Sequence, residues 1–128
     1  MNRTILLTGI VFGVLAIVLG AFGAHALEKL VEPSAIRTFE TGVKYQMYHA
    51  LFLLFLGSSS RLTEKSKKII YYLILTGVIC FSFSIYFLAT NSLTDFDFKI
   101  FGIITPLGGM LLIGGWCLLG YRAYRQFN

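Results

Sequence analysis

The sequence predicts an all-α polytopic membrane protein with four transmembrane helices, built as one domain over residues 1–128. Charge placement is the first observation: no charged residue lies within Thr4–Leu27, Tyr45–Ser60, Ile69–Thr94 or Ile100–Tyr121. Composition is the second, with 56% hydrophobic and 13% charged residues and a mean hydropathy of +0.75, whereas soluble domains carry about 25% charged residues. Because a charge near the bilayer centre costs about 2.5–3.5 kcal/mol, the four uncharged stretches are expected to lie in lipid.

The distribution of Lys and Arg orients these spans. With the N-terminus in the cytoplasm, 7 basic residues fall inside and 4 outside, as the positive-inside rule requires. The inside set is Arg3, Arg61, Lys65, Lys67, Lys68, Arg122 and Arg125, and the outside set is Lys29, Arg37, Lys44 and Lys99. We therefore expect a multi-pass protein of the cytoplasmic (inner) membrane with both termini cytoplasmic. The net charge of +5 is interpreted as membrane topology, and no nucleic-acid partner is expected.

The first span covers about Ile5–Phe22, and small residues recur along it at spacings of three or four. They are Gly9, Gly13, Ala16, Gly20 and Ala24. Small residues at helical spacing allow a neighbouring helix to approach closely, so this face is predicted to contact another helix. The sequence Ala24-His25-Ala26 resembles a signal-peptide cleavage site, but the preceding apolar run is too long for one, and we expect a retained span.

The segment Leu27–Gly42 separates the first two spans. Leu27, Leu30 and Val31 lie at i, i+3 and i+4 with charged residues opposite, a pattern typical of a short amphipathic helix on the outer surface. Pro33 starts a new segment, in which Ser34 is predicted to cap the next helix.

The second uncharged window, Tyr45–Ser60, is too short to cross the membrane alone. As a helix it would be about 24 Å long, against a hydrocarbon core of about 30 Å. We therefore expect this helix to begin near Ser34–Thr41 and to carry Arg37, Glu40 and Lys44 through the outer interface.

The remaining spans are predicted over Ile69–Thr90 and, after an outer loop, over about residues 100–121. Pro106 lies inside the last span and cannot donate a hydrogen bond to the Gly102 carbonyl. A helix kink at Pro106 and Gly102 is expected. Trp116 is expected at the inner membrane interface.

Polar side chains are predicted to gather in the outer half of the membrane. Depth estimates place His49, Ser84 and Thr105 each about 10 Å below the outer boundary. The full candidate polar cluster is His49, Tyr45, Tyr48, His25, Glu40, Ser84 and Thr105. Three interpretations stay open for it: hydrogen bonds between helices, a small-molecule, lipid or ion site open to the outside, and a His-ligated haem or metal.

No catalytic residue, cofactor or metal is predicted. The sequence contains no Gly-x-Ser-x-Gly or His-Glu-x-x-His motif, and no carboxylate inside an uncharged stretch. His25 and His49 differ in estimated depth by about 10 Å, which disfavours haem ligation by the pair, and a metal would need a third ligand such as Glu40.

Three stretches resemble a known family. They are Gly20–Leu27 (Gly-Ala-Phe-Gly-Ala-His-Ala-Leu), Tyr45–Leu51 (Tyr-Gln-Met-Tyr-His-Ala-Leu), and Thr105–Gly109 (Thr-Pro-Leu-Gly-Gly) with Gly115-Trp116. In this order they are similar to small bacterial inner-membrane proteins called domain of unknown function four-two-three, which have a small eukaryotic transmembrane relative. The resemblance implies four spans and a retained first helix, but supplies no activity.

Two functions are therefore considered, and an enzyme ranks third behind both. The first is a non-catalytic membrane component that acts by helix packing, in a homo-oligomer or a larger membrane complex within the lipid bilayer. Its basis is the Gly and Ala content of the first and last spans. The alternative is a binder or carrier of a small molecule or lipid at the polar cluster around His49.

Overall fold

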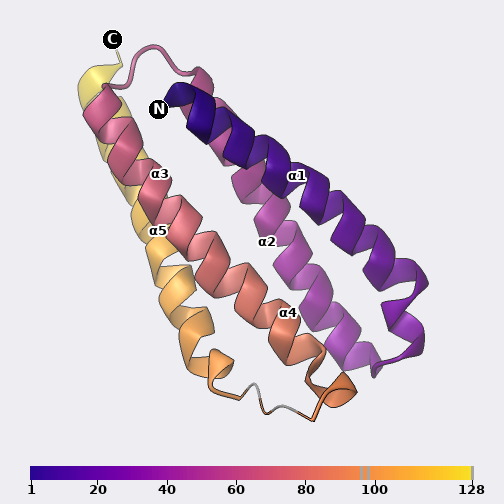
Figure 1. Ribbon diagram of the computed structural model, residues 1–128. Coiled ribbons are helices and arrows are strands. Elements are labelled where there is room, and N and C mark those ends of the chain that lie inside the picture. Colours follow the sequence, from indigo (N-terminus) through magenta and orange to yellow (C-terminus); the bar gives the residue numbers. More distant parts are fainter. Residues whose placement is uncertain (96, 98, 128) are drawn as a thin grey trace.

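The computed structural model, which describes residues 1–95, 97 and 99–127, consists of helices without strands in that part of the chain. Four long rods make up the fold (Figure 1). They are α1 (Asn2–His25), α2 (Pro33–Ser58), a composite third rod and α5 (Phe101–Gln126). The third rod joins α3 (Glu64–Val78), a π-helical turn η2 (Ile79–Phe83) and α4 (Ser84–Ala89). The predicted all-α class is confirmed.

Consecutive rods run in opposite directions, so both chain termini lie at one end of the bundle (Figure 1). We call this the terminal end, and it also holds the loop between α2 and α3. The opposite end holds two short 3-10 turns, η1 (Leu27–Lys29) and η3 (Asn91–Leu93). Three stretches among the described residues are long and apolar enough to cross a membrane, namely Asn2–Lys29, Glu64–Ala89 and Phe101–Gln126.

Helix α2 has 26 residues, as many as the second and third of these stretches, but is more polar, because its first half contains Arg37, Glu40 and Lys44. The predicted extension of the second helix behind its uncharged window is confirmed, since α2 starts at Pro33. The predicted Ser34 cap is wrong. Pro33 occupies the first helical position and the extended Glu32 is the N-cap, because the fixed φ of proline suits the first turn of a helix.

The prediction of an amphipathic α-helix between the first two rods is also wrong, since a single 3-10 turn, η1, lies there. Leu27 is fully buried against Phe39 and Ala89, whereas Leu30 is exposed. The residue before a proline avoids the α conformation, so Glu32 is extended. Too few residues then remain between His25 and Glu32 for a surface α-helix.

Helices α1 and α2 pack closely through small residues. A Cβ added to Gly9 would lie 2.9 Å from the Ala50 carbonyl oxygen, and one added to Gly57 would lie 2.9 Å from Leu6 Cγ. The predicted contact face of the first span is thus confirmed, and its partner is α2 of the same chain.

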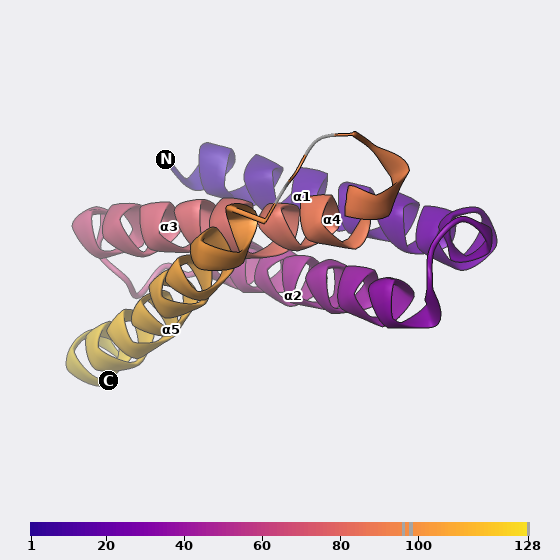
Figure 2. The ribbon, with the colours of Figure 1, turned by 90° about the horizontal axis from the view of Figure 1, so that it is seen from below.

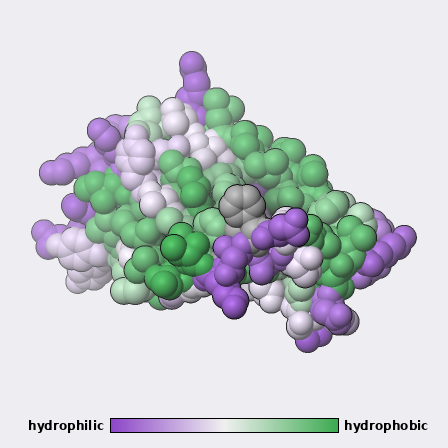
Figure 3. All heavy atoms as spheres, turned by 60° about the horizontal axis from the view of Figure 1, so that its bottom comes forward, coloured by the Kyte–Doolittle hydropathy of each residue, from purple (hydrophilic) through white to green (hydrophobic). Residues whose placement is uncertain are grey.

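Helix α5 packs on the third rod and diverges from α1 and α2 toward the C-terminus (Figure 2). Glycines again make the contact: a Cβ at Gly108 would lie 2.4 Å from the Phe81 amide nitrogen, and a Cβ at Gly115 would lie 2.6 Å from Ile74 Cδ1. The rest of α5 is mostly exposed. Figure 3 shows broad hydrophobic areas on the face viewed there, with hydrophilic atoms at its left and right edges and in one group near its middle.

Polar contacts tie the rods together at the terminal end. The Gln126 side chain accepts from the Thr63 amide at 2.9 Å and donates to the Ser66 hydroxyl at 3.0 Å. Thr63 also caps α3 by accepting from the Ser66 amide. The buried Lys67 ammonium donates to Asn2 Oδ1 at 3.2 Å. The last turn of α5 is therefore fixed to the first turn of α3, and α3 to the start of α1.

A buried polar network crosses three rods near the middle of the bundle. The fully buried Gln46 of α2 donates from Nε2 to the Phe12 carbonyl of α1 at 2.8 Å. Its Oε1 accepts from the Tyr86 hydroxyl of α4 at 2.6 Å. One residue therefore connects α1, α2 and α4.

Replacing Tyr86 with phenylalanine should lower the free energy of unfolding by about 1–2 kcal/mol, because Gln46 Oε1 would then be buried without a donor. Tyr72→Phe is the matched control, since Tyr72 is exposed, and it should change the unfolding free energy by less than about 0.5 kcal/mol. Unfolding in mixed micelles, followed by circular dichroism, measures both. Equal effects of the two changes would show that the network does not stabilise the bundle.

Candidate functional site

His49 of α2 is buried and both of its ring nitrogens are engaged. Its Nδ1 lies 2.6 Å from the Tyr45 carbonyl oxygen one turn earlier. Its Nε2 accepts a hydrogen bond of 3.0 Å from the indole Nε1 of Trp116, on α5. The imidazole is only 3% exposed.

These contacts fix the protonation of His49. An indole nitrogen can only donate, so Nε2 carries no proton, and Nδ1 must carry the hydrogen that is donated to Tyr45. The ring is therefore neutral. In this arrangement His49 has no free nitrogen with which to bind a metal ion or accept a proton.

A cavity of about 300 Å³ lies beside this pair, between α2, η2 and α5. We call it the α2–α5 groove. Its lining residues are Tyr45, His49, Phe81, Gly109, Leu112, Ile113 and Trp116. Aromatic rings pack along it: the Tyr45 and Phe81 centroids are 5.0 Å apart, and Trp116 lies edge-on to Phe52 at 4.7 Å. Tyr45 and Trp116 are 40% and 51% exposed, so they form the rim.

The local sequence explains how the groove forms. Gly108 allows the α5 backbone to contact η2 at Phe81, whereas a Cβ at the next residue, Gly109, would lie 3.6 Å from the Phe81 ring. Gly108 therefore allows the close contact between α5 and η2, and Gly109 leaves the space beside the Phe81 ring unfilled. Phe81 itself belongs to the π-helical turn, and such turns occur frequently at functional sites.

The predicted polar cluster divides into separate groups. Tyr45 and His49 line the groove, and the Tyr48 ring packs against Tyr45 at 5.5 Å on the exposed side. The Ser84 and Thr105 hydroxyls pair with each other at 2.6 Å, away from the groove lining. His25 ends α1 and is exposed, and Glu40 is exposed on α2.

The structure therefore pairs His49 with Trp116 and Ser84 with Thr105. Thr105 lies eleven residues, about 16 Å, along α5 from Trp116. The depth estimate assumed that the second span starts near Gly42. The depth of each of these residues in the membrane stays a prediction.

Helix α5 continues without interruption through Pro106. The Thr105 hydroxyl donates back to the Phe101 carbonyl at 3.0 Å, and nothing lies within 4 Å of a Cβ added at Gly102. The bend angle at Pro106 and Gly102 stays a prediction.

Comparison with known proteins places the chain in a family. A family model described as "Protein of unknown function (DUF423)" matches residues 19–109. The chain belongs to this family. Among similar proteins, a UPF0382 membrane protein of Staphylococcus saprophyticus is 36% identical, over 91% of this chain and 93% of its own length. The UPF0382 membrane protein YwdK of Bacillus subtilis is 34% identical, over 96% of this chain and 98% of its own length. One from Haemophilus influenzae is 33% identical, over 89% of this chain and 88% of its own.

This DUF423 protein is thus a membrane protein of a family without an assigned activity. No solved structure matches it. The matched range contains Tyr45, His49, Phe81 and Gly109 of the groove and ends before Leu112.

Sequence reasoning missed two features of the DUF423 protein. It did not single out Gln46, although an amide in the middle of an uncharged span is expensive unless bonded. It also did not predict that the Trp116 indole bonds to His49. The first could have been found from its place in the span, but the second depends on how α5 crosses α2.

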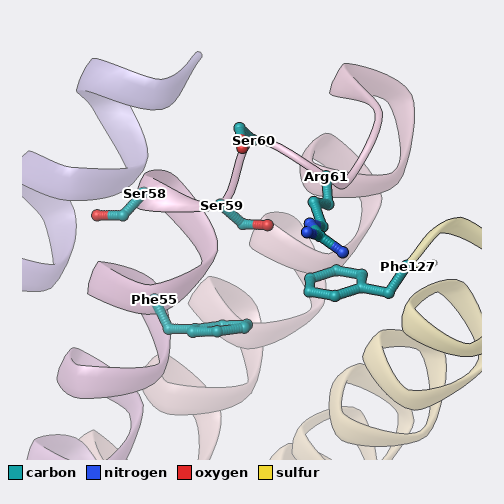
Figure 4. A pocket seen from close by; sticks show the side chains of 6 residues that line it. All are labelled: Phe55, Ser58, Ser59, Ser60, Arg61 and Phe127. Atoms are coloured by element: carbon teal, nitrogen blue, oxygen red, sulfur yellow. The ribbon is translucent and has the colours of Figure 1, made fainter.

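The DUF423 protein has another hollow at its terminal end, of about 270 Å³, lined by Phe55, Ser58, Ser59, Ser60, Arg61 and Phe127. Figure 4 shows the Arg61 side chain over the Phe127 ring, with a guanidinium-to-centroid distance of 5.6 Å, and the Ser59 hydroxyl on the side facing Arg61. Helices α2 and α5 both end here, and helix C-termini favour a cation. We interpret Arg61 as an electrostatic cap for these helix ends.

Proposed function

We propose that this membrane protein binds a small, lipid-soluble molecule in the α2–α5 groove, taking it laterally from the bilayer. The observation that carries the proposal is the lining of the groove: two aromatic side chains, Tyr45 and Phe81, and two aliphatic ones surround one neutral hydrogen-bonded pair, His49 and Trp116. Concave, mostly apolar cavities with few polar groups are the usual form of small-molecule sites.

The depth and rigidity of the groove support this function. Tyr45 directly follows Lys44 of α2 and opens its uncharged window, so the rim would lie where α2 passes from the outer interface into the hydrocarbon. The His49–Trp116 bond joins α2 to α5 directly, through the protein's own side chains. A preformed site loses little conformational entropy on binding, and its exposed rim gives lipid-soluble molecules direct access.

Self-association through α5 is a second candidate function. The exposed face of this helix includes Ile103, Met110 and Tyr124, of which Tyr124 is 85% exposed. The glycine contacts on α1 and at Gly108 and Gly115 are made within the chain, so they no longer argue for a partner. Native mass spectrometry in mild detergent should detect a dimer if α5 forms an interface, and a strict monomer would exclude it.

Photo-crosslinking tests the ligand-binding function. Benzophenone, an apolar photoreactive probe, would be irradiated with the protein in lipid nanodiscs and its attachment sites mapped by peptide mass spectrometry. We expect saturable labelling of Leu112, which is buried within the groove, in excess of the exposed Ile103 and Met110. Labelling that follows exposure alone, strongest at Ile103 and Met110, would show partition into lipid without a site.

The membrane orientation is also proposed: both termini on the cytoplasmic side of the inner membrane. The excess of Lys and Arg at the terminal end supports it. In a background without Cys80 and Cys117, an impermeant maleimide should label Ser92→Cys in intact cells and Ser60→Cys only after lysis. The reverse pattern would invert the orientation.

A further inference from the structure

The hydroxyl of Tyr45, a residue on the rim of the groove, is a polar group that the fold does not use. The ring lines the groove and packs against Phe81, His49 and Tyr48. Within the part of the chain that the structure describes, the hydroxyl has no hydrogen-bond partner. By contrast, the other polar side-chain groups of the groove, the His49 nitrogens and the Trp116 indole, bond to one another or to the backbone.

This hydroxyl needs a partner once a ligand covers it. A ring packed over Tyr45 would exclude water from the hydroxyl, and a polar group without a partner in an apolar medium costs several kcal/mol. A molecule that enters the groove therefore gains if it brings an acceptor to Tyr45.

The count of donors and acceptors restricts what that molecule can be. A carbonyl oxygen accepts the Tyr45 hydrogen and brings no hydrogen of its own. An alcohol or amine would leave one hydrogen without an acceptor, since one bond between two hydroxyls satisfies only one of them. A charged ligand would meet no counter-charge, because no groove-lining residue is charged.

We propose that the ligand is a flat apolar ring compound bearing a carbonyl, of the aryl ketone or quinone class, whose carbonyl oxygen accepts from the Tyr45 hydroxyl. Its ring packs between Phe81 and the Trp116 rim, against the side chains of Leu112 and Ile113. This inference rests on the proposed binding function and specifies the ligand class of the same groove.

The test compares benzophenone with diphenylmethane, which has the same two rings but no carbonyl. Trp116 is the single tryptophan of the chain, so its fluorescence reports on the groove. Quenching of Trp116 fluorescence by benzophenone gives the affinity for the ketone. Recovery of that fluorescence as diphenylmethane displaces benzophenone gives the affinity for the hydrocarbon. The wild-type protein should prefer the ketone by about fivefold, the value of one net hydrogen bond.

Two Tyr→Phe variants, each lacking one hydroxyl oxygen, distinguish a hydrogen bond at Tyr45 from a general preference of the ketone for the lipid phase. Tyr45→Phe should abolish the ketone preference. Tyr48→Phe should keep it, since Tyr48 lies one turn away and does not line the groove. Equal affinities of the wild-type protein for both probes, or an unchanged preference in Tyr45→Phe, would overturn the ligand class and leave the binding function standing. Failure of both probes to bind saturably would overturn the binding function itself.

Discussion

Replacing Gly108 with alanine should lower the free energy of unfolding by about 2–3 kcal/mol, whereas the same change at Gly109 should alter it by less than about 0.5 kcal/mol. A Cβ at Gly108 would lie 2.4 Å from the Phe81 amide nitrogen and 2.7 Å from the Cys80 carbonyl carbon. Backbone atoms cannot rotate away, so α5 must move off η2, and overpacking of this kind costs about 1–3 kcal/mol.

At Gly109 the added methyl group would be in ordinary contact with the Phe81 ring, at 3.6 Å. The gain in helix propensity over glycine, about 0.5–1 kcal/mol, offsets any loss. Because the two residues are adjacent in sequence, each variant controls for the other. Reversible unfolding in mixed micelles, followed by circular dichroism, measures the difference. Similar losses at both positions would contradict the close contact between α5 and η2.

The second large effect concerns binding. Changing Gly109 to leucine should weaken benzophenone binding at least tenfold, because the new side chain extends from the groove wall toward Phe81 and occupies the space a ring would fill. Each ligand methylene excluded from an apolar contact loses about 0.8 kcal/mol, so losing contact with one ring exceeds the 1.4 kcal/mol that corresponds to tenfold. Quenching of Trp116 measures the affinity.

Gly114→Leu is the matched control for this binding loss. Gly114 is on the same helix, and nothing lies within 4 Å of a Cβ added there. It does not line the groove. We expect Gly114→Leu to bind benzophenone with wild-type affinity. A comparable loss of affinity in both variants would show that leucine disturbs α5 as a whole and does not block the groove.

Much of the fold follows from the sequence because the bilayer constrains it strongly. The uncharged stretches predicted the helices, and the short window at Tyr45–Ser60 correctly required the second helix to begin before it, near Ser34–Thr41, where α2 starts at Pro33. Small residues at helical spacing on α1 correctly indicated a close helix contact. These features depend on local composition and on the length needed to cross lipid.

The missed features depend on contacts between distant segments. The π-helical turn at Ile79–Phe83 has no local signature; there the α5 backbone approaches at Gly108, and Ser82 donates to the Gly42 carbonyl at 2.8 Å. His49 and Trp116 lie 67 residues apart, and their bond depends on the crossing of α2 and α5. The sequence thus indicated Tyr45 and His49 as candidate residues but gave neither their partners nor their depth.

The most direct measurement is the mass-spectrometric comparison of small molecules that co-extract with wild-type protein and with the Gly109→Leu variant, both purified from native membranes in mild detergent. An occupied groove predicts an apolar compound bearing a carbonyl, retained at near one molecule per wild-type chain and absent from the variant. Identical sets of extracted lipids in both preparations, with no compound depleted in the variant, would contradict binding in the α2–α5 groove.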